Sequence, residues 1–346
     1  GAGVMGAGIA AQVANAGVDV VLLDIVPAGN NDRSVIARTA VERLTKTEPA
    51  PLMHPSFAKR VTPGNIEDDL ELLAECDWII EAVIERLDVK QDLYARIEGA
   101  RKRGAVVSSN TSTIPLAQLT KKMSDEMRSD FLVAHFFNPP RYMRLLELVT
   151  SGDTRPEAVQ RIRDFADRVL GKGVVDCHDR PGFIANRVGT HWMQNAMGGA
   201  MELGLSVEEA DAIVAEPMGI PRTGAFGLMD LVGLDLMPHI LASLRDNLSP
   251  DDPVCTGASM PIFLDKMLAD GYTGRKGKGG FYRMRREGGK RLKDGIDLTT
   301  GEYRLSPKVR PPCVAAAKHG GVRALVEHPS DGGRYAWRVL GPTLRY

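Results

Sequence analysis

Three glycines at the start of the sequence constrain the fold more than any other feature. Gly1, Gly3 and Gly6 stand in a Gly-x-Gly-x-x-Gly pattern at the head of an alanine-rich segment that ends at Gly17, and a continuous apolar run then leads to Asp24. Glycines permit a tight turn and close packing of a helix on a strand, and an unbroken apolar run is typical of a strand buried on both faces. The pattern predicts a turn, a helix and a buried parallel strand.

The same alternation continues through the first half of the chain. Apolar, strand-like runs stand at 76–83, 105–109 and 131–136, and a helical pattern at 87–101 separates the first two. Strands that alternate with helices indicate an α/β, doubly wound sheet of the Rossmann type. Residues 28–73 are predicted to be mainly helical and polar.

The second half has a different character, because long helical patterns dominate it. They lie near 183–203, 236–247 and 261–269, and another begins at Ser206, where Ser206-x-x-Glu209 forms a capping box. After residue 284 the sequence turns basic and glycine-rich, which is typical of a linker. We therefore predict a first α/β domain over 1–176, a mostly α-helical C-terminal domain over 177–284, and a linker with the start of a further helical unit over 285–346.

Composition excludes several classes of protein. Lys plus Arg and Asp plus Glu number 44 each, so the formal net charge is zero and favours neither a nucleic-acid nor a membrane partner. The four cysteines are scattered without a Cys-x-x-Cys pair, so we expect no metal site and no disulfide framework. No apolar run reaches the roughly 18 residues of a membrane span. A cytoplasmic protein is the simplest interpretation.

The glycine motif and Asp24 together predict a dinucleotide site. In such motifs the helix N-terminus faces the pyrophosphate and the glycines let the backbone approach it. Asp24 stands 18 positions after Gly6, near the distance at which an acid can bind the adenosine ribose hydroxyls. Ile25 and Val26 add no positive charge for a 2′-phosphate, so NAD is favoured over NADP. The alternative is a structural strand-turn-helix with a surface aspartate.

The segment 133–149 carries the clearest signal for catalysis. It has His135 in a predicted buried strand and Glu147 twelve positions later in a second apolar run, with an Asn-Pro-Pro turn between them. A carboxylate that accepts the proton of one ring nitrogen fixes the tautomer and raises the basicity of the other, as a general base requires. The pattern also fits a hydrogen-bonded core histidine and a charge at a strand edge, and it does not decide between these interpretations.

Polar residues follow two other predicted strands. Residues 108–112 (SSNTS) come directly after one strand, and Glu85 and Lys90 come after another. Ligands of open α/β sheets bind outside the carboxyl ends of the strands, where such groups could orient a substrate oxygen. A polar turn with helix caps and a solvated helix face with a weak ion pair are the alternatives.

Taken together and in this order, the motifs resemble those of the 3-hydroxyacyl-CoA dehydrogenase family. The resemblance runs from Gly1 to about Tyr282 and rests on GAGVMGAGIA (1–10), EAVIERLDVK (81–90), SSNTSTIPL (108–116), AHFFNPPRYMRLLELV (134–149), DRPGFIANR (179–187) and GRKGKGGFY (274–282). It implies NAD-dependent oxidation of (S)-3-hydroxyacyl-CoA to 3-ketoacyl-CoA in fatty-acid β-oxidation.

The resemblance also implies roles for individual residues. His135 corresponds to the general base and Glu147 to its partner, while Ser112 corresponds to the serine that binds the substrate's 3-oxygen. Asn186 corresponds to an asparagine that contacts the substrate from the domain junction. The implied cofactor-binding residues are Gly1, Gly3, Val4, Met5, Gly6, Asp24, Ala82, Val83, Glu85, Lys90 and Asn110.

Two regions depart from the family. Residues 28–73 do not follow its pattern, so no CoA-contacting residue is assigned there. The stretch GGRYAWRVLGPTLRY (332–346) lies beyond the two-domain enzyme and resembles bacterial fusions in which an enoyl-CoA hydratase domain follows. We therefore expect the dehydrogenase part of a multifunctional enzyme, without the strand that normally precedes the glycine motif.

Other functions and partners stay open at this point. A dehydrogenase for free 3-hydroxy acids typically uses a catalytic lysine, and a non-catalytic NAD-binding homologue often loses a catalytic side chain. Enzymes of this family pair through their helical domains. The sequence therefore fits a homodimer through that domain or pairing with a further domain of the same polypeptide.

Overall fold

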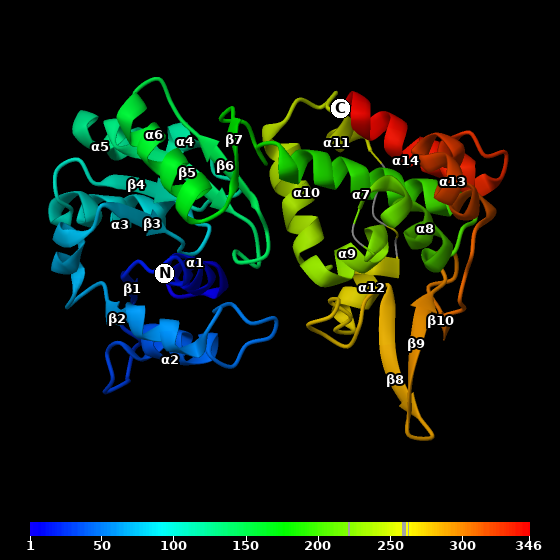
Figure 1. Cartoon of the computed structure of the whole chain (residues 1–346), viewed down its shortest axis with the longest axis horizontal. Helices are drawn as coiled ribbons and strands as arrows, with labels where there is room; N and C mark the ends of the chain where they lie inside the picture. The colour runs from blue at the N-terminus through cyan, green and yellow to red at the C-terminus, as the bar shows by residue number, and fades with distance from the viewer. Residues whose placement is uncertain (221, 258–260, 262) are drawn as a thin grey trace. The chain divides into compact units, whose positions relative to one another are not determined.

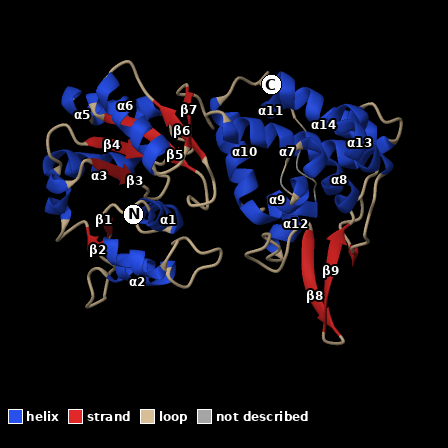
Figure 2. Ribbon diagram, viewed as in Figure 1, coloured by secondary structure: helices blue, strands red, loops and turns tan. Residues whose placement is uncertain are grey.

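The computed structural model describes residues 1–220, 222–257, 261 and 263–346, which divide into two compact units (Figure 1). The first unit comprises Gly1–Ile184 and the second Ala185–Tyr346. Strands alternate with helices in the first unit, and helices dominate the second (Figure 2). The predicted fold class, a Rossmann-type sheet followed by a mostly helical domain, is confirmed.

The sheet of the first unit has two parts. β1 (Val20–Asp24) pairs in parallel with β2 (Val61–Asn65). The other part runs in chain order through β3 (Trp78–Glu81), β4 (Val106–Ser109), β5 (Phe131–Phe136), β6 (Leu145–Val149) and β7 (Gly173–Cys177). Its neighbours are parallel except for β5 and β6, which are antiparallel. The helices are α1 (Val4–Asn15), α2 (Val35–Leu44), α3 (Leu87–Ala100), α4 (Leu116–Leu119), α5 (Asp125–Ser129) and α6 (Pro156–Asp164).

The burial of the central strands explains why the apolar runs in the sequence predicted them correctly. Every residue of β4 and β5 is buried, and strands buried on both faces have continuous apolar runs. Residues 28–73 contain α2 and short 3-10 helices at Pro55–Arg60 and Leu70–Glu75, but the helical prediction missed the strand β2. Its sequence contains Pro63 and Gly64, which are both unfavourable in strands. The proline is tolerated because β2 has a single neighbour among the described strands.

A cavity of about 590 Å³ lies between the two parts of the sheet. Residues of β1 line one side and residues of β3 the other, and apolar side chains of α1 contribute Ile9 and Val13. Within the described residues β1 pairs only with β2, and β3 only with β4. The largely apolar lining of this cavity does not suit a charged nucleotide.

The second unit combines helices with a small antiparallel sheet. The helices are α7 (Ala185–Glu202), α8 (Val207–Val214), α9 (Gly224–Val232), α10 (Leu236–Asn247), α11 (Pro253–Thr256), α12 (Phe263–Ala269), α13 (Pro312–Val326) and α14 (Asp331–Arg345). The strands are β8 (Tyr282–Glu287), β9 (Lys290–Ile296) and β10 (Tyr303–Leu305). The capping box predicted at Ser206 and Glu209 is present, and residue 262 of the predicted 261–269 helix lies outside the described residues.

Residues 285–296 are not the linker that the sequence predicts. They form the hairpin of β8 and β9, which turns at Gly288 and Gly289, and both glycines have positive φ. A Gly-Gly turn between alternating residues is a hairpin signal, and the high charge of the flanks obscured it. α13 and α14 then pack with the helices of this unit, where the side chains of Tyr335 and Val339 are fully buried.

No single helix of the described residues is long and apolar enough to cross a membrane, although α9 and α10 together, bent by 93°, are so by length and composition.

A buried aspartate explains the glycines of the 274–282 motif. Asp230 on α9 is 3% exposed and accepts hydrogen bonds from the backbone amides of Phe281, at 2.7 Å, and Tyr282, at 2.8 Å. A Cβ at Gly280 would overlap Asp230 Oδ1, and one at Gly274 would overlap the carbonyl oxygen of Asp230. The motif therefore ties α9 to the start of β8.

We predict that Asp230→Ala destabilises the second unit by about 3 kcal/mol, because two buried N–H groups lose their acceptor. Urea unfolding followed by tryptophan fluorescence in a Trp78→Phe background reports on Trp192 and Trp337 of this unit. Asp246→Ala, an exposed change on α10, is the control and should stay within about 0.5 kcal/mol of the parent. Equal unfolding midpoints for the two variants would contradict the role of Asp230.

Candidate active site

The glycine loop leaves open space where a ligand could approach the backbone. A Cβ at Gly1 would lie 2.5 Å from the carbonyl oxygen of Ala82, and one at Gly6 would overlap the carbonyl oxygen of Gly1. A Cβ at Gly3 would meet no atom within 4 Å. Gly3 is also the N-cap of α1, whose first turn has no acidic residue and no side-chain cap. The uncapped amides form the kind of helix N-terminus that binds phosphate.

Asp24 lies beside this loop at the end of β1. Its Oδ2 accepts a hydrogen bond from the Ala2 amide at 2.5 Å, and its Oδ1 accepts one from the Ile25 amide at 2.7 Å. Each carboxylate oxygen has a second lone pair that can accept a ribose hydroxyl. The loop, the helix N-terminus and the acid thus fit the pyrophosphate and adenosine ribose of NAD.

Hydrogen bonds join the strand ends into one edge. The amide of Asn110, which follows β4, donates to the carbonyl oxygen of Glu81 at 2.8 Å. The side-chain oxygen of Asn110 accepts from the amide of Phe136 at 2.8 Å. Gly1 approaches Ala82 directly after β3. The glycine loop and the ends of β3, β4 and β5 therefore lie along the same edge, as expected for the carboxyl ends of parallel strands.

His135 and Glu147 are directly opposite each other in the antiparallel pair of β5 and β6. His135 Nδ1 lies 2.8 Å from Glu147 Oε2, and the two residues are 6% and 0% exposed. Glu147 Oε1 accepts a hydrogen bond from the amide of Ile184 at 3.1 Å. The carboxyl group thus accepts the proton of Nδ1, which leaves Nε2 as the nitrogen that can accept a proton.

The surroundings of the pair are apolar. The His135 ring lies 4.4 Å from the ring centroid of Phe137 and 5.7 Å from that of Phe183. Burial and the neighbouring charge of Glu147 raise the pKa of the Cys177 thiol to about 12, so it stays protonated. A water-poor setting strengthens the interaction between the imidazole and the carboxyl group.

No role in the site was predicted for Phe183. Among the described residues it is the one non-glycine residue with positive φ, at 47°, and it follows Gly182 at 72°. This backbone turns the Phe183 ring onto His135 and directs the Ile184 amide to Glu147. A glycine followed by an aromatic residue is the only sequence signal, and it does not reveal a left-handed phenylalanine.

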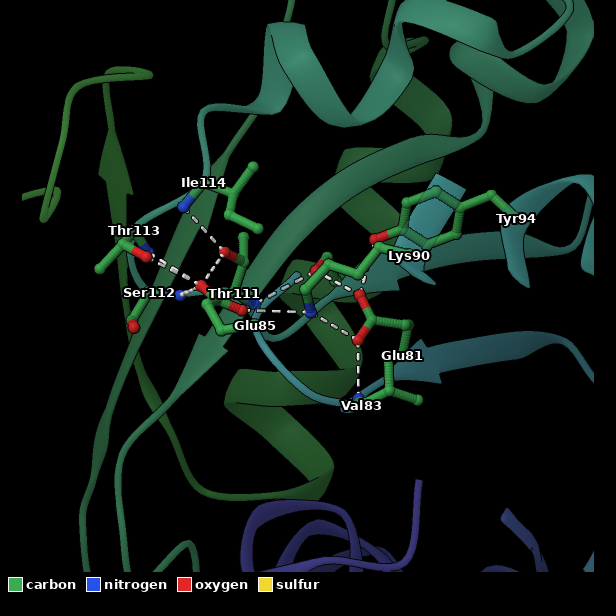
Figure 3. A network of polar contacts seen from close by, with 10 residues as sticks. Glu81, Val83, Glu85, Lys90, Tyr94, Thr111, Ser112, Thr113 and Ile114 are labelled. Atoms are coloured by element: carbon green, nitrogen blue, oxygen red, sulfur yellow. Dashed lines mark hydrogen bonds and ion pairs between the residues drawn. The ribbon is translucent and has the colours of Figure 1, made fainter. Parts of the chain in front are cut away.

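A polar network occupies the ends of β3 and β4 (Figure 3). The Lys90 ammonium lies 2.7 Å from Glu81 Oε1 and 3.2 Å from Glu85 Oε2, and Lys90 is 1% exposed. Glu85 also accepts a hydrogen bond from the Ser112 amide at 3.1 Å. A direct contact of Glu85 or Lys90 with a cofactor stays a prediction, as do cofactor contacts of Val4, Met5, Ala82, Val83 and Asn110.

Two further predictions concern Asn186 and metal ions. Asn186 is half-buried at the start of α7, in the second unit, and a role beside His135 stays a prediction. In the part of the chain that the structure describes, no group of three or more His, Cys, Asp or Glu residues is arranged to hold a metal ion.

Comparison with known families and proteins gives consistent matches. The family described as "3-hydroxyacyl-CoA dehydrogenase, NAD binding domain" matches residues 1–180, and that described as "3-hydroxyacyl-CoA dehydrogenase, C-terminal domain" matches residues 182–284. The crystal structure of Mycobacterium tuberculosis FadB2 is similar, with a TM-score of 0.68 and 30% identity over 82% of this chain and 96% of that one.

Two relatives differ in how much of their length the chain covers. It is 42% identical over 309 residues, 89% of the chain, to a Rickettsia felis protein described as a fatty acid oxidation complex trifunctional enzyme, but spans only 43% of that protein. It is 41% identical over 287 residues to a Deinococcus radiodurans protein described as a 3-hydroxyacyl-CoA dehydrogenase, covering 83% of the chain and 82% of the relative. With both family domains matched over residues 1–180 and 182–284, the chain belongs to the 3-hydroxyacyl-CoA dehydrogenase family.

Proposed function

We propose that this chain catalyses the NAD-dependent interconversion of (S)-3-hydroxyacyl-CoA and 3-ketoacyl-CoA. The observation that carries the proposal is the buried His135–Glu147 pair on the sheet edge that also bears the glycine loop. The name of the Deinococcus relative supports the acyl-CoA substrate. The name of the Rickettsia relative supports a place in fatty-acid oxidation. A cytoplasmic location is part of the same proposal.

His135 is the general base of this reaction. Nε2 accepts the proton of the substrate's 3-hydroxyl, and Glu147 holds the tautomer and stabilises the imidazolium that forms. The rings of Phe137 and Phe183 restrict the imidazole to one orientation. When bound at the glycine loop and Asp24, NAD supplies the acceptor for the hydride from C3.

Two other side chains orient the substrate. Ser112 is half-buried, and its hydroxyl makes no hydrogen bond to any residue the structure describes, so it can donate to the 3-oxygen. A contact of Asn186 with the acyl-CoA is part of the same proposal. Fixing the oxygen between Ser112 and the base would align the C–H bond for transfer, and alignment of this kind contributes much of an enzyme's rate.

We expect His135→Gln to lower kcat at least about 10²-fold, because the reaction loses its proton acceptor. The assay is oxidation of NADH with acetoacetyl-CoA. His178→Gln, an exposed change in the same unit, should leave kcat unchanged. Near-normal turnover by His135→Gln would remove the residue from the mechanism.

A dehydrogenase for free 3-hydroxy acids is the nearer alternative. We predict a kcat/KM for acetoacetyl-CoA at least tenfold above that for free acetoacetate, a difference of about 1.4 kcal/mol in transition-state binding. Rates across a series of 3-ketoacyl-CoA lengths would then define the acyl preference. Equal or higher rates with the free acid would favour the alternative, and no oxidation with any thioester would favour a non-catalytic homologue.

For partners, we propose pairing within the polypeptide and not a homodimer through α7 and α8. The apolar face of α14, with Tyr335, Ala336 and Val339 each 0% exposed, packs with these helices in one core. We predict a mass near 37.6 kDa for the chain by light scattering at micromolar concentration. A stable species of twice that mass would contradict this proposal.

A further inference from the structure

A single aspartate ties together two segments that carry proposed catalytic groups or hold them. Asp179 lies in the segment that follows β7, and its Oδ1 accepts a hydrogen bond from the amide of Leu116 at 2.8 Å. Its Oδ2 accepts one from the amide of Ala117 at 3.1 Å. These two amides open α4, which follows the loop that contains Ser112. The carboxylate therefore joins the loop after β4 to the segment after β7.

The first turn of α4 has Asp179 as its acceptor. The N-cap residue is Pro115, which provides no side-chain cap, so the first amides of the helix need an acceptor from elsewhere in the chain. Asp179 is half-buried and gives one oxygen to each amide. Two bonds to one carboxylate fix its plane as well as its position, and bonds to a charged acceptor are roughly twice as strong as neutral ones. The contact thus holds the start of α4 in a defined place.

A tight turn follows Asp179 directly. The amide of Phe183 donates to the carbonyl oxygen of Arg180 at 2.9 Å, and Pro181 and Gly182 occupy the two central positions of the turn. Gly182 has a φ of 72°, which is close to the value that a type II turn needs at its second central position. Proline restricts its own φ as well. The backbone between the aspartate and Phe183 therefore has little freedom.

The turn delivers two contacts to the proposed catalytic pair. The ring of Phe183 lies beside that of His135, and the amide of Ile184 donates to Glu147 Oε1 at 3.1 Å. The other carboxylate oxygen, Glu147 Oε2, is the atom that faces His135 Nδ1. A movement of the turn would change how both residues of the pair are held, and Asp179 anchors the turn to α4.

The loop on the other side of the anchor is also short and tied down. Ser112 stands four residues before the first residue of α4. Between them, the amide of Ile114 donates to the Thr111 hydroxyl at 3.0 Å (Figure 3). Pro115 then restricts the backbone immediately before the helix. The position of the Ser112 hydroxyl therefore depends on where α4 begins, and Asp179 holds that point.

We propose that Asp179 is a positioning residue, which sets the separation between the Ser112 hydroxyl and the Nε2 atom of His135. This rests on the proposed function, because it takes Ser112 as the donor to the substrate's 3-oxygen and His135 as the acceptor of its proton. Asp179 acts through the backbone of the two segments that it joins. Both groups must meet one oxygen atom, so a shift of either segment misaligns the C–H bond for hydride transfer.

A double-mutant cycle tests this coupling. Asp179→Ala should lower kcat with acetoacetyl-CoA at least about tenfold, because a misplacement of roughly 1 Å can cost about 10²-fold, and should change KM for NADH less than about threefold. In a Ser112→Ala background the same change should lower kcat less than about threefold further. Asp179→Asn keeps one acceptor oxygen and should recover part of the lost kcat. A kcat for Asp179→Ala within about twofold of the parent, or full multiplication of the two effects, would overturn the proposal.

Hydrogen exchange in the ligand-free chain separates positioning from simple capping of α4. Capping alone would affect only the amides of Leu116 and Ala117, which bond to the carboxylate directly. Positioning requires more, because the segment after β7 is released as well. Asp179→Ala should therefore also speed exchange of the Ile184 amide at least about tenfold, although Asp179 makes no bond to it.

The matched control is Asp176→Ala, which removes an exposed carboxylate on β7 that pairs with Arg163. It should leave both kcat and exchange of the Ile184 amide unchanged. Exchange of that amide at the parent rate in Asp179→Ala would overturn the positioning role. A parent chain that is inactive on every thioester would refute the proposed function, while the exchange result would still decide whether Asp179 holds the segment after β7.

Discussion

The contact between His135 and Glu147 depends on one antiparallel pair in an otherwise parallel sheet. Residues twelve apart become direct neighbours only because β6 runs back along β5. A slip of one residue would move Glu147 to the opposite face of the sheet, away from the ring. Close packing on both faces of β5 opposes such a slip, because every buried side chain of the strand would move to the opposite face.

A buried lysine, Lys172, holds the connection between these strands. Lys172, 3% exposed, donates from its ammonium to the carbonyl oxygens of Pro140 and Met143 and lies 5.6 Å from the centroid of the Phe136 ring. Burial lowers the pKa of this lysine to about 8. Lys172 donates to backbone acceptors, so it holds the turn without adding a carboxylate near Glu147. The buried charges at this edge therefore fix the positions of the surrounding groups. They add little to the free energy of unfolding, because the cost of their desolvation offsets much of what their pairing contributes.

Much of this arrangement could be predicted from the sequence, for specific physical reasons. β4 and β5 are buried on both faces, and an Asn-Pro-Pro turn between two apolar runs indicates that β6 returns along β5. β2 could not be predicted, because Pro63 and Gly64 conceal an edge strand. The β8–β9 hairpin was not predicted, because the many positively charged residues of its strands are typical of a linker.

Contacts set by three-dimensional packing were also beyond prediction. The partners of Lys90 depend on how α3 lies against β3, and spacing along the chain does not give that relation. The left-handed conformation of Phe183 depends on its fit against His135. The cofactor site shows the same dependence. The glycine loop bridges the end of the apolar cavity, with Ala2 on Asp24 of β1 and Gly1 against Ala82 after β3. The spacing of β1 and β3 therefore sets the distance from Asp24, the proposed ribose-binding acid, to His135 and Glu147, the proposed catalytic pair.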